Sequence, residues 1–100
     1  MKVFLSHKMT GLNETEVFDI RKKACLKIKN RYPNESIYII DNYTHSDAPE
    51  NAGRLWHLGK SIQQLSDADT IYFCPGWYRA KGCFVERIIA ILYGIKIIKK

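Results

Sequence analysis

Cysteine is scarce in this chain, and its three cysteines follow neither a disulfide pattern nor a metal-binding pattern. Their number is odd, and Cys25, Cys74 and Cys83 lack the paired spacing that zinc sites require. The sequence therefore predicts no disulfide framework, no metal site and a reducing environment. Two roles stay open for Cys83, near an expected helix start: a thiol of lowered pKa or, as the favoured interpretation, a small packing residue.

The sequence also lacks long apolar runs, a signal-peptide pattern, internal repeats and Pro- or Gly-rich linkers. Without an apolar run of membrane length we expect no membrane partner, and without a secretion signal we expect a cytoplasmic protein. One hundred residues without a linker predict a single domain over residues 1–100, with one modest core.

Acidic residues are few relative to basic ones, ten against sixteen, which leaves a net charge of +6. This imbalance predicts an anionic partner, either nucleic acid or a phosphorylated small molecule. Many of the cations fall between Arg21 and Arg31, which is typical of the solvated face of a helix. Nucleic acid is the less favoured partner, because no recognition-helix signature accompanies the charge.

Short apolar runs alternate with segments of helical periodicity along the chain. Four such runs predict strands, at residues 2–5, 37–40, 70–74 and 95–98. Three apolar stripes at helical spacing predict the intervening helices: Val17, Ile20, Ala24 and Ile28; Leu55, Leu58, Ile62 and Leu65; Val85, Ile88, Ile89 and Leu92. Asn13 and Glu16 resemble a capping pair, and Pro33 and Gly94 are typical helix-ending residues.

This strict alternation of strands and helices predicts a three-layer α/β fold of the flavodoxin or Rossmann type, with a parallel four-stranded sheet. Right-handed crossovers favour the strand order 2-1-3-4. The winding direction then reverses between the first and third strands. The loops that follow these strands, residues 6–11 and 75–82, therefore face one crevice, where such sheets bind ligands.

The second of these loops, within residues 74–86, carries a mixture of side chains that a simple connection would not need. Trp77 and Tyr78 suit stacking on a base, or equally a subunit interface. Arg79 and Lys81 suit phosphate binding, or equally a solvated surface. We favour a ligand-binding loop because these side chains occur together.

Other candidates stand at the ends of strands and helices. Glu86 is expected in the first turn of a helix, where the helix dipole favours a carboxylate, but the loop before it favours a functional role. His7 and Lys8 follow the first strand and are candidates for ligand and phosphate contact. Asp41 ends the second strand and is a candidate for a sugar hydroxyl, whereas Asp69, at the amino end of a strand, is interpreted as a turn or cap residue.

Two blocks of the sequence resemble small proteins related to nucleoside 2-deoxyribosyltransferases. The opening MKVFLSHKMTGL is similar to a strand followed by Ser-Gly-Pro-Met-Thr-Gly, and SDADTIYFCPGWYRAKGCFVE is similar to an apolar strand followed by Pro-Gly-Trp and Gly-x-x-x-Glu. The resemblance covers residues 1–12 and 61–98, and elsewhere only the order of strands and helices matches. It implies cleavage or exchange of the N-glycosidic bond of a nucleoside or nucleotide, without a cofactor.

The resemblance makes Glu86 the nucleophile that attacks C1′ of the sugar and forms a covalent glycosyl intermediate. The second carboxylate of the family, eight residues before Asp69, is replaced here by Ser61, which cannot supply a negative charge. The Ser-Gly-Pro of the family also becomes Ser-His-Lys. The catalytic positions of the enzyme hypothesis are therefore Glu86 and Ser61. The alternative is a non-catalytic module that binds a nucleotide or a nucleotide-derived signal on the same scaffold.

Topology and resemblance together predict one substrate site for a nucleoside or nucleotide. Its binding residues are Ser6, His7, Lys8, Met9, Thr10, Gly11, Asp41, Gly76, Trp77, Tyr78, Arg79, Lys81 and Gly82. The third helix is apolar nearly all round from Val85 to Tyr93, and one sheet cannot cover all of these side chains. We therefore expect a homodimer or a higher homo-oligomer that covers the outer side of this helix.

Overall fold

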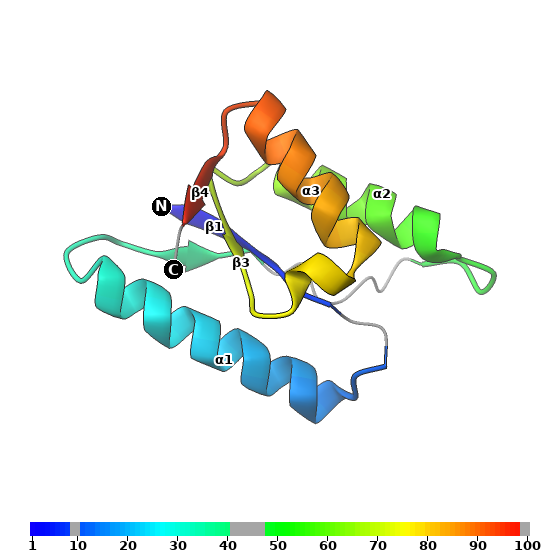
Figure 1. The fold of residues 1–100 in the computed structure, drawn as a ribbon, viewed down its shortest axis with the longest axis horizontal. Helices are drawn as coiled ribbons and strands as arrows, with labels where there is room; N and C mark the ends of the chain where they lie inside the picture. Colours follow the sequence, from blue (N-terminus) through cyan, green and yellow to red (C-terminus); the bar gives the residue numbers. More distant parts are fainter. Residues whose placement is uncertain (9–10, 41–47, 99–100) are drawn as a thin grey trace.

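The structure, a computed structural model, describes residues 1–8, 11–40 and 48–98 (Figure 1). Within these ranges the chain forms four strands, three α-helices and one short 3-10 turn. Met9, Thr10 and Asp41, which the sequence assigns to the substrate site, lie outside the described residues.

The four strands form one parallel sheet in the order β2-β1-β3-β4, which confirms the predicted topology. Their bounds are Lys2–Ser6 for β1, Tyr38–Ile39 for β2, Thr70–Phe73 for β3 and Lys96–Ile98 for β4. The central strands are β1 and β3, and their register places Ser6 opposite Phe73 at the carboxyl ends. Because β2 and β3 flank β1, the winding direction reverses between β1 and β3, as predicted.

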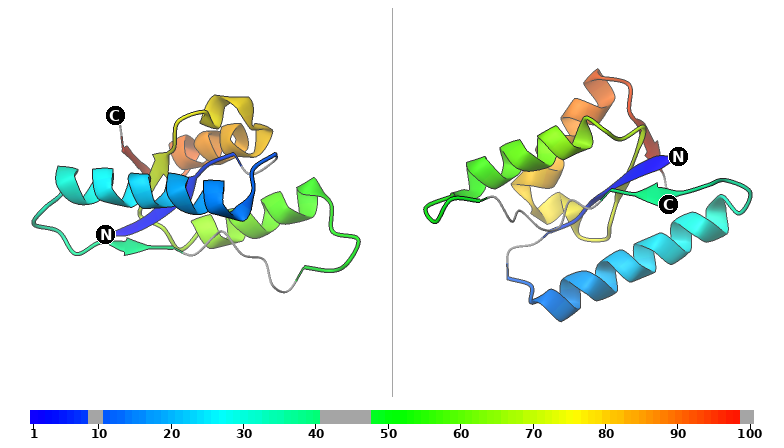
Figure 2. Two further views of the ribbon diagram at one scale, coloured as in Figure 1. Left: turned by 90° about the horizontal axis from the view of Figure 1, so that it is seen from below. Right: turned by 180° about the vertical axis from the view of Figure 1, so that it is seen from behind.

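The three helices cover both faces of this sheet. The helix α1, Glu14–Arg31, lies on one face, and α2, Arg54–Leu65, lies with α3, Lys81–Leu92, on the other (Figures 1 and 2). A sheet covered on both faces needs apolar side chains on both, which explains why β1 and β3 are continuous apolar runs. No helix within the described ranges combines the length and the apolar character needed to cross a membrane.

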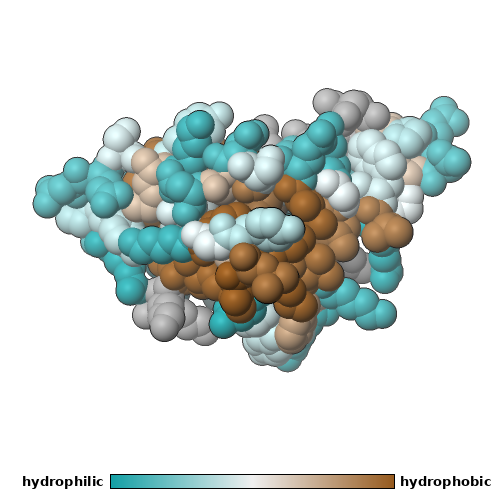
Figure 3. Space-filling model, turned by 90° about the horizontal axis from the view of Figure 1, so that it is seen from above, coloured by the Kyte–Doolittle hydropathy of each residue, from teal (hydrophilic) through white to brown (hydrophobic). Residues whose placement is uncertain are grey.

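The outer side of α3 and the residue that follows it carry apolar side chains that stay largely exposed within the described part of the chain. Phe84, Ile88, Ile91, Leu92 and Tyr93 are all exposed. Figure 3, which looks onto the α3 side of the molecule, shows apolar surface gathered at its centre and bordered by hydrophilic side chains. These exposures confirm the expectation that the sheet of one chain does not cover all the apolar side chains of this helix.

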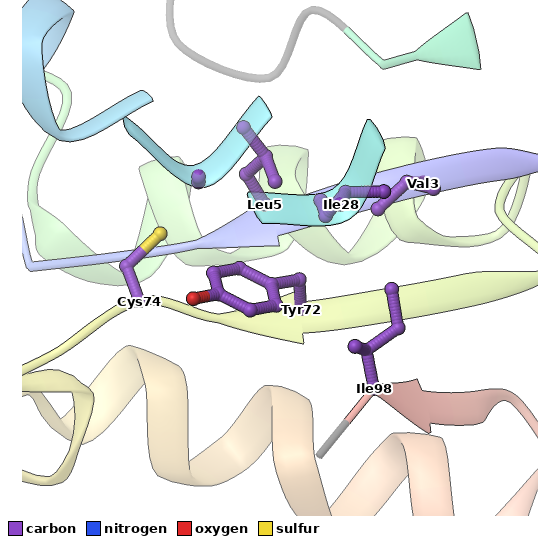
Figure 4. Close-up of a cluster of buried hydrophobic side chains, with 7 residues drawn as sticks. Val3, Leu5, Ile28, Tyr72, Cys74 and Ile98 are labelled. Atoms are coloured by element: carbon purple, nitrogen blue, oxygen red, sulfur yellow. The ribbon is translucent and has the colours of Figure 1, made fainter. Parts of the chain in front are cut away.

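Each face of the sheet has its own buried core. On the α1 side, the cluster consists of Val3, Leu5, Ala24, Ile28, Tyr72, Cys74 and Ile98 (Figure 4). On the α2–α3 side, it consists of Phe4, Ile40, Leu65, Ile71, Phe73 and Ala90. Alternate residues of β1 thus point to opposite faces, as the pleat of a strand requires.

Helix ends follow local signals in the sequence, whereas some members of the predicted apolar stripes are exposed. The Asn13 side chain accepts a hydrogen bond from the Glu16 N–H at 2.8 Å, which confirms the cap of α1. Gly94 follows α3 with a φ of 71°, in the left-handed region. Besides Ile88 and Leu92 of the third stripe, Leu55 of the second stripe is 81% exposed. It stands in the first turn of α2, which extends beyond the end of the sheet (Figure 1), so no strand lies beneath it.

Candidate functional site

Two loops leave the sheet side by side at the carboxyl ends of β1 and β3. The Cys74 N–H donates to the carbonyl of Ser6 at 2.9 Å, which extends the pairing of the two strands one residue beyond β3. The first loop continues through His7. The second loop turns at Gly76, which has a φ of 87°, a value that glycine adopts at little energetic cost. The two loops therefore start at the reversal point where open α/β sheets bind ligands.

A 3-10 turn, Trp77–Arg79, separates this loop from α3 and was not predicted from the sequence. Because α3 starts at Lys81, Glu86 is its sixth residue and lies in the second turn. The expectation of a first-turn position is therefore wrong, and the helix dipole does not explain this carboxyl. Glu86 shares its helix face with Cys83 and Ala90, which are also buried.

The centre of the site is a hydrogen bond between Ser6 and Glu86. The Ser6 hydroxyl donates to Oε1 of Glu86 at 2.7 Å, across 80 residues of sequence. The two side chains are almost fully buried, with 1% of Ser6 and 6% of Glu86 exposed. The end of β1 and the second turn of α3 are thus joined through the one carboxyl that the sequence assigns to catalysis.

The second oxygen of this carboxyl takes no part in the bond with Ser6. Within the described part of the chain, Glu86 Oε2 has no hydrogen-bond partner. No side-chain nitrogen or oxygen of the same residues is both fully buried and unpartnered. Oε2 therefore reaches accessible space, while Ser6 holds Oε1 in place.

Burial controls the charge of Glu86. Desolvation raises the pKa of Glu86 from 4.5 to about 7, and the hydrogen bond from Ser6 opposes this rise without cancelling it. At neutral pH the carboxyl is therefore divided between its acid and its ionised form. A carboxyl with this behaviour, at the carboxyl end of a parallel sheet, is a candidate functional group.

Cys83 lies next to the same hydroxyl but is not a reactive thiol. Burial raises the pKa of Cys83 to about 11, against a smaller lowering effect of its hydrogen bond with Ser6. The interpretation of a lowered pKa is therefore wrong. The physical reason is that Cys83 lies on the buried face of α3, where desolvation outweighs the effect of the helix terminus.

His7 is held neutral by Arg21. Nη1 of Arg21 donates to Nε2 of His7 at 3.2 Å, and a guanidinium has only donors, so Nε2 must be the acceptor. The proton of the ring then resides on Nδ1, which lies 3.4 Å from the carbonyl oxygen of Lys8. Burial, and after it the charge of Arg21, lowers the pKa of His7 below 6.5. His7 is therefore assigned as a neutral imidazole at physiological pH.

Arg21 is the site residue that the sequence analysis missed. It was grouped with the solvated cations of its helix, but its Nη2 also donates to the carbonyl of Ile40 at 3.2 Å. The side chain thereby joins the ends of β1 and β2. Its position was a usable signal, because Arg21 stands four residues after Val17 and three before Ala24, on the buried stripe of α1.

Trp77 is placed in packing contacts within the chain. Its ring lies 5.1 Å from that of Phe73 and 5.3 Å from that of Phe84, centroid to centroid. The Arg87 guanidinium lies 5.1 Å from the Trp77 centroid, within the range of a cation–π contact. Trp77 therefore fixes the 3-10 turn against β3 and α3. These contacts favour packing over the stacking on a base that the sequence left open.

The remaining predicted binding residues are more exposed than Ser6 and Glu86. Lys8 and Gly82 are partly buried, and Gly82 faces Leu58 of α2, whose Cδ1 would lie 3.5 Å from an added Cβ. Four others are exposed on the loops: Gly11, Tyr78, Arg79 and Lys81.

Ser61 is not joined to the buried pair. It lies partly buried on α2 and, among the described residues, makes no hydrogen bond to Ser6 or Glu86. Of the predicted set, the structure thus brings Ser6 and Glu86 together, whereas His7 bonds to Arg21 of α1 instead.

A shallow hollow of about 330 Å³ opens at the opposite end of the sheet. It is lined by Met1, Glu35, Asp69, Thr70 and Lys96. Asp69 is occupied there, because its two oxygens accept the Lys2 N–H at 3.1 Å and one also accepts the Thr70 hydroxyl at 2.8 Å. These bonds, first the one from Lys2, lower the pKa of Asp69. The interpretation of Asp69 as a cap at the far end of the sheet is confirmed.

Within residues 1–8, 11–40 and 48–98, no three His, Cys, Asp or Glu side chains are grouped so as to hold a metal ion. Comparison of the chain with protein-family models, with curated proteins and with solved structures gives no match in any of the three. The case for a function therefore depends on the buried carboxyl and the residues around it.

Proposed function

We propose that the protein hydrolyses or exchanges the N-glycosidic bond of a nucleoside or nucleotide, with Glu86 as the nucleophile at C1′ of the sugar. The observation that carries the proposal is the buried Ser6–Glu86 pair at the reversal point of the sheet. The sequence blocks that resemble nucleoside 2-deoxyribosyltransferases supply the substrate class. No cofactor takes part in the proposed reaction.

The geometry of Glu86 suits nucleophilic attack through one oxygen. Ser6 holds Oε1, and Oε2 is accessible, so the carboxyl meets a substrate in one fixed orientation. In the reaction, ionised Oε2 bonds to C1′ while the C–N bond breaks and its electron pair leaves with the base. Water or a second base then attacks C1′ and frees the carboxylate.

The charge of the site also favours an anionic or polar substrate. The loops around the pair carry Lys8, Arg79 and Lys81, and Arg21 stands at the ends of β1 and β2. A phosphorylated nucleotide bound at these loops would find cations to pair with its phosphate. All three cysteines are free thiols, which supports a reducing, cytoplasmic location.

The test incubates the protein with a panel of ribo- and deoxyribonucleosides and their 5′-monophosphates and measures the release of free base by chromatography. We expect turnover by the wild type and none by Glu86→Gln, with the affinity for nucleotide unchanged within about threefold, because the amide keeps the shape and loses the nucleophile. Glu35→Gln, which removes an exposed carboxyl at the far end of the sheet, is the matched control and should retain full activity. Ser61→Asp should raise turnover if the missing carboxylate limits the rate.

The second candidate is a non-catalytic module that binds a nucleotide or a nucleotide-derived signal. It is favoured by Ser61, which stands apart from Glu86 and cannot act as a second acid or base. In such a module the half-protonated Glu86 would hydrogen-bond a base or a ribose hydroxyl. Nucleotide binding without any release of base, unchanged by Ser61→Asp, would replace the enzyme proposal with this one. Failure to bind any nucleotide would reject both.

A further inference from the structure

The outer side of α3 carries an apolar surface that a second copy of this chain would fit. We define the α3 patch as Phe84, Ile88, Ile91, Leu92 and Tyr93, all of which are exposed in the single chain. Figure 3 shows that this side of the molecule gathers its apolar surface into one area with a hydrophilic border. Patches of this kind, large, continuous and rimmed by polar residues, mark interaction sites.

The area of the α3 patch matches what one half of a dimer interface needs. Its five side chains are between 48% and 79% exposed. They therefore present roughly 650 Å² per copy, close to the roughly 800 Å² that each partner contributes to a standard interface. Neighbouring atoms of the same helix would supply much of the remainder.

The spacing of the α3 patch suits helix-on-helix packing. Phe84, Ile88 and Ile91 follow one another on α3 at intervals of four and three. This is the repeat with which two helices interlock along a common seam. The same patch on two copies, related by a two-fold axis, is self-complementary.

The charges of α3 favour a second copy over a charged partner. Residues 88–95 contain no charged side chain, so two copies meet without burying an ion or opposing like charges. The two flanking cations lie over aromatic rings of their own chain: Arg87 is 5.1 Å from the Trp77 ring, and Lys96 is 5.0 Å from the Tyr32 ring. An anionic membrane surface would instead require several cations around the apolar face.

We propose that the protein is a homodimer with two-fold symmetry in which the α3 patches of two copies pack against each other. Glu86 lies on the opposite, inward face of the same helix, so the dimer would hold α3 from both sides. The proposal does not depend on the reaction, because it concerns a surface that the crevice does not use.

The experiment is sedimentation velocity of the wild type and two charge variants, from about 1 µM to about 100 µM. Ile88 and Leu26 are each 55% exposed, the first in the α3 patch and the second on α1, on the other face of the sheet. We expect twice the monomer mass for the wild type and for Leu26→Glu. Ile88→Glu should raise the dimer dissociation constant at least about tenfold, as a central interface residue does.

Circular dichroism will show whether Ile88→Glu is folded, and Ile91→Ala, which suits a helix, serves as the second variant with the same direction of effect. A wild type that is monomeric throughout the concentration range overturns the proposal, whether or not it binds anionic vesicles. Dissociation by Leu26→Glu also overturns it, because the interface would then involve α1. Retention of the wild-type dimer by both Ile88→Glu and Ile91→Ala has the same consequence.

Discussion

Glu86→Gln should stabilise the protein above neutral pH and leave its stability in acid unchanged. Only 6% of Glu86 is exposed, and burial raises its pKa from 4.5 to about 7. Each pH unit between these two values corresponds to about 1.4 kcal/mol, so ionised Glu86 costs about 3 kcal/mol in the folded state. Glutamine has no proton to lose, keeps the shape of the side chain and can still accept the hydrogen bond from Ser6.

The sign follows from proton binding. The folded state holds the Glu86 proton more tightly than the unfolded chain, so the free energy of unfolding falls as the pH rises from 4.5 to about 7. Below this window the wild type and Glu86→Gln should be equally stable. Above it, the variant should be more stable by about 3 kcal/mol, which for a domain of this size is a rise in Tm of more than about 10 °C.

Urea denaturation, followed by tryptophan fluorescence at about pH 4 and about pH 8.5, measures this difference directly. Subtracting the wild type from the variant at each pH removes the contribution of other titrating groups, His7 included. Glu35→Gln, at an exposed carboxyl, is the control and should change stability by less than about 0.5 kcal/mol at either pH. A gap of equal size at both pH values, or no gain at pH 8.5, would refute the assignment of a buried, pKa-shifted carboxyl.

Three further outcomes are expected. Ser6→Ala removes the one hydrogen bond that lowers the pKa of Glu86, so carbon-detected NMR should find this pKa above that of the wild type, and an unchanged value would contradict the contact. Gly76→Ala places a side chain at a φ of 87° and should destabilise the protein by about 1–2 kcal/mol in urea denaturation; a neutral effect would mean that the turn relaxes. Arg21→Gln removes the charge that helps to lower the pKa of His7, so proton NMR titration should show that this pKa rises. An unchanged pKa would contradict the contact between Arg21 and His7.

The fold could be predicted from the sequence because local and long-range signals agree. The Asn13 cap, the break at Pro33 and the stop at Gly94 set helix ends, and the structure places them where the sequence does. Continuous apolar strands predicted a sheet covered on both faces, and the handedness of crossovers then left one strand order. Each of these signals depends on neighbouring residues or on general rules of chain connection.

The errors arise where a contact joins distant parts of the chain. Leu55 has helical spacing, but spacing does not reveal that its turn lies beyond the end of the sheet. Glu86 lies in the second turn of α3 and not in the first, and this difference of one turn changes the explanation from helix dipole to burial. The bond from Ser6 to Glu86 spans 80 residues, so only the topology suggested that the two segments meet.

Arg21 shows why charge alone is a weak guide to location. Its neighbours in sequence are solvated cations, and composition assigns it to the same group. Its place on the stripe of Val17 and Ala24 outweighs this, because the face of a helix is set by spacing and not by residue type. A cation on a buried stripe must find acceptors, and the nearest are His7 and the carbonyl of Ile40.

The cost of Glu86 is itself an argument for function. A glutamine at this position would satisfy the Ser6 hydroxyl equally well and would avoid the penalty for ionisation, so the contact with Ser6 does not explain why the residue is an acid. Nor does helix stability, because the second turn of α3 gains little from a negative charge. What an acid offers and an amide does not is a proton that can be released near neutral pH and a charged oxygen that can attack or hold a substrate. A group that weakens the fold while supplying this chemistry at the carboxyl end of the sheet is what the trade-off between stability and activity leads one to expect of a working site.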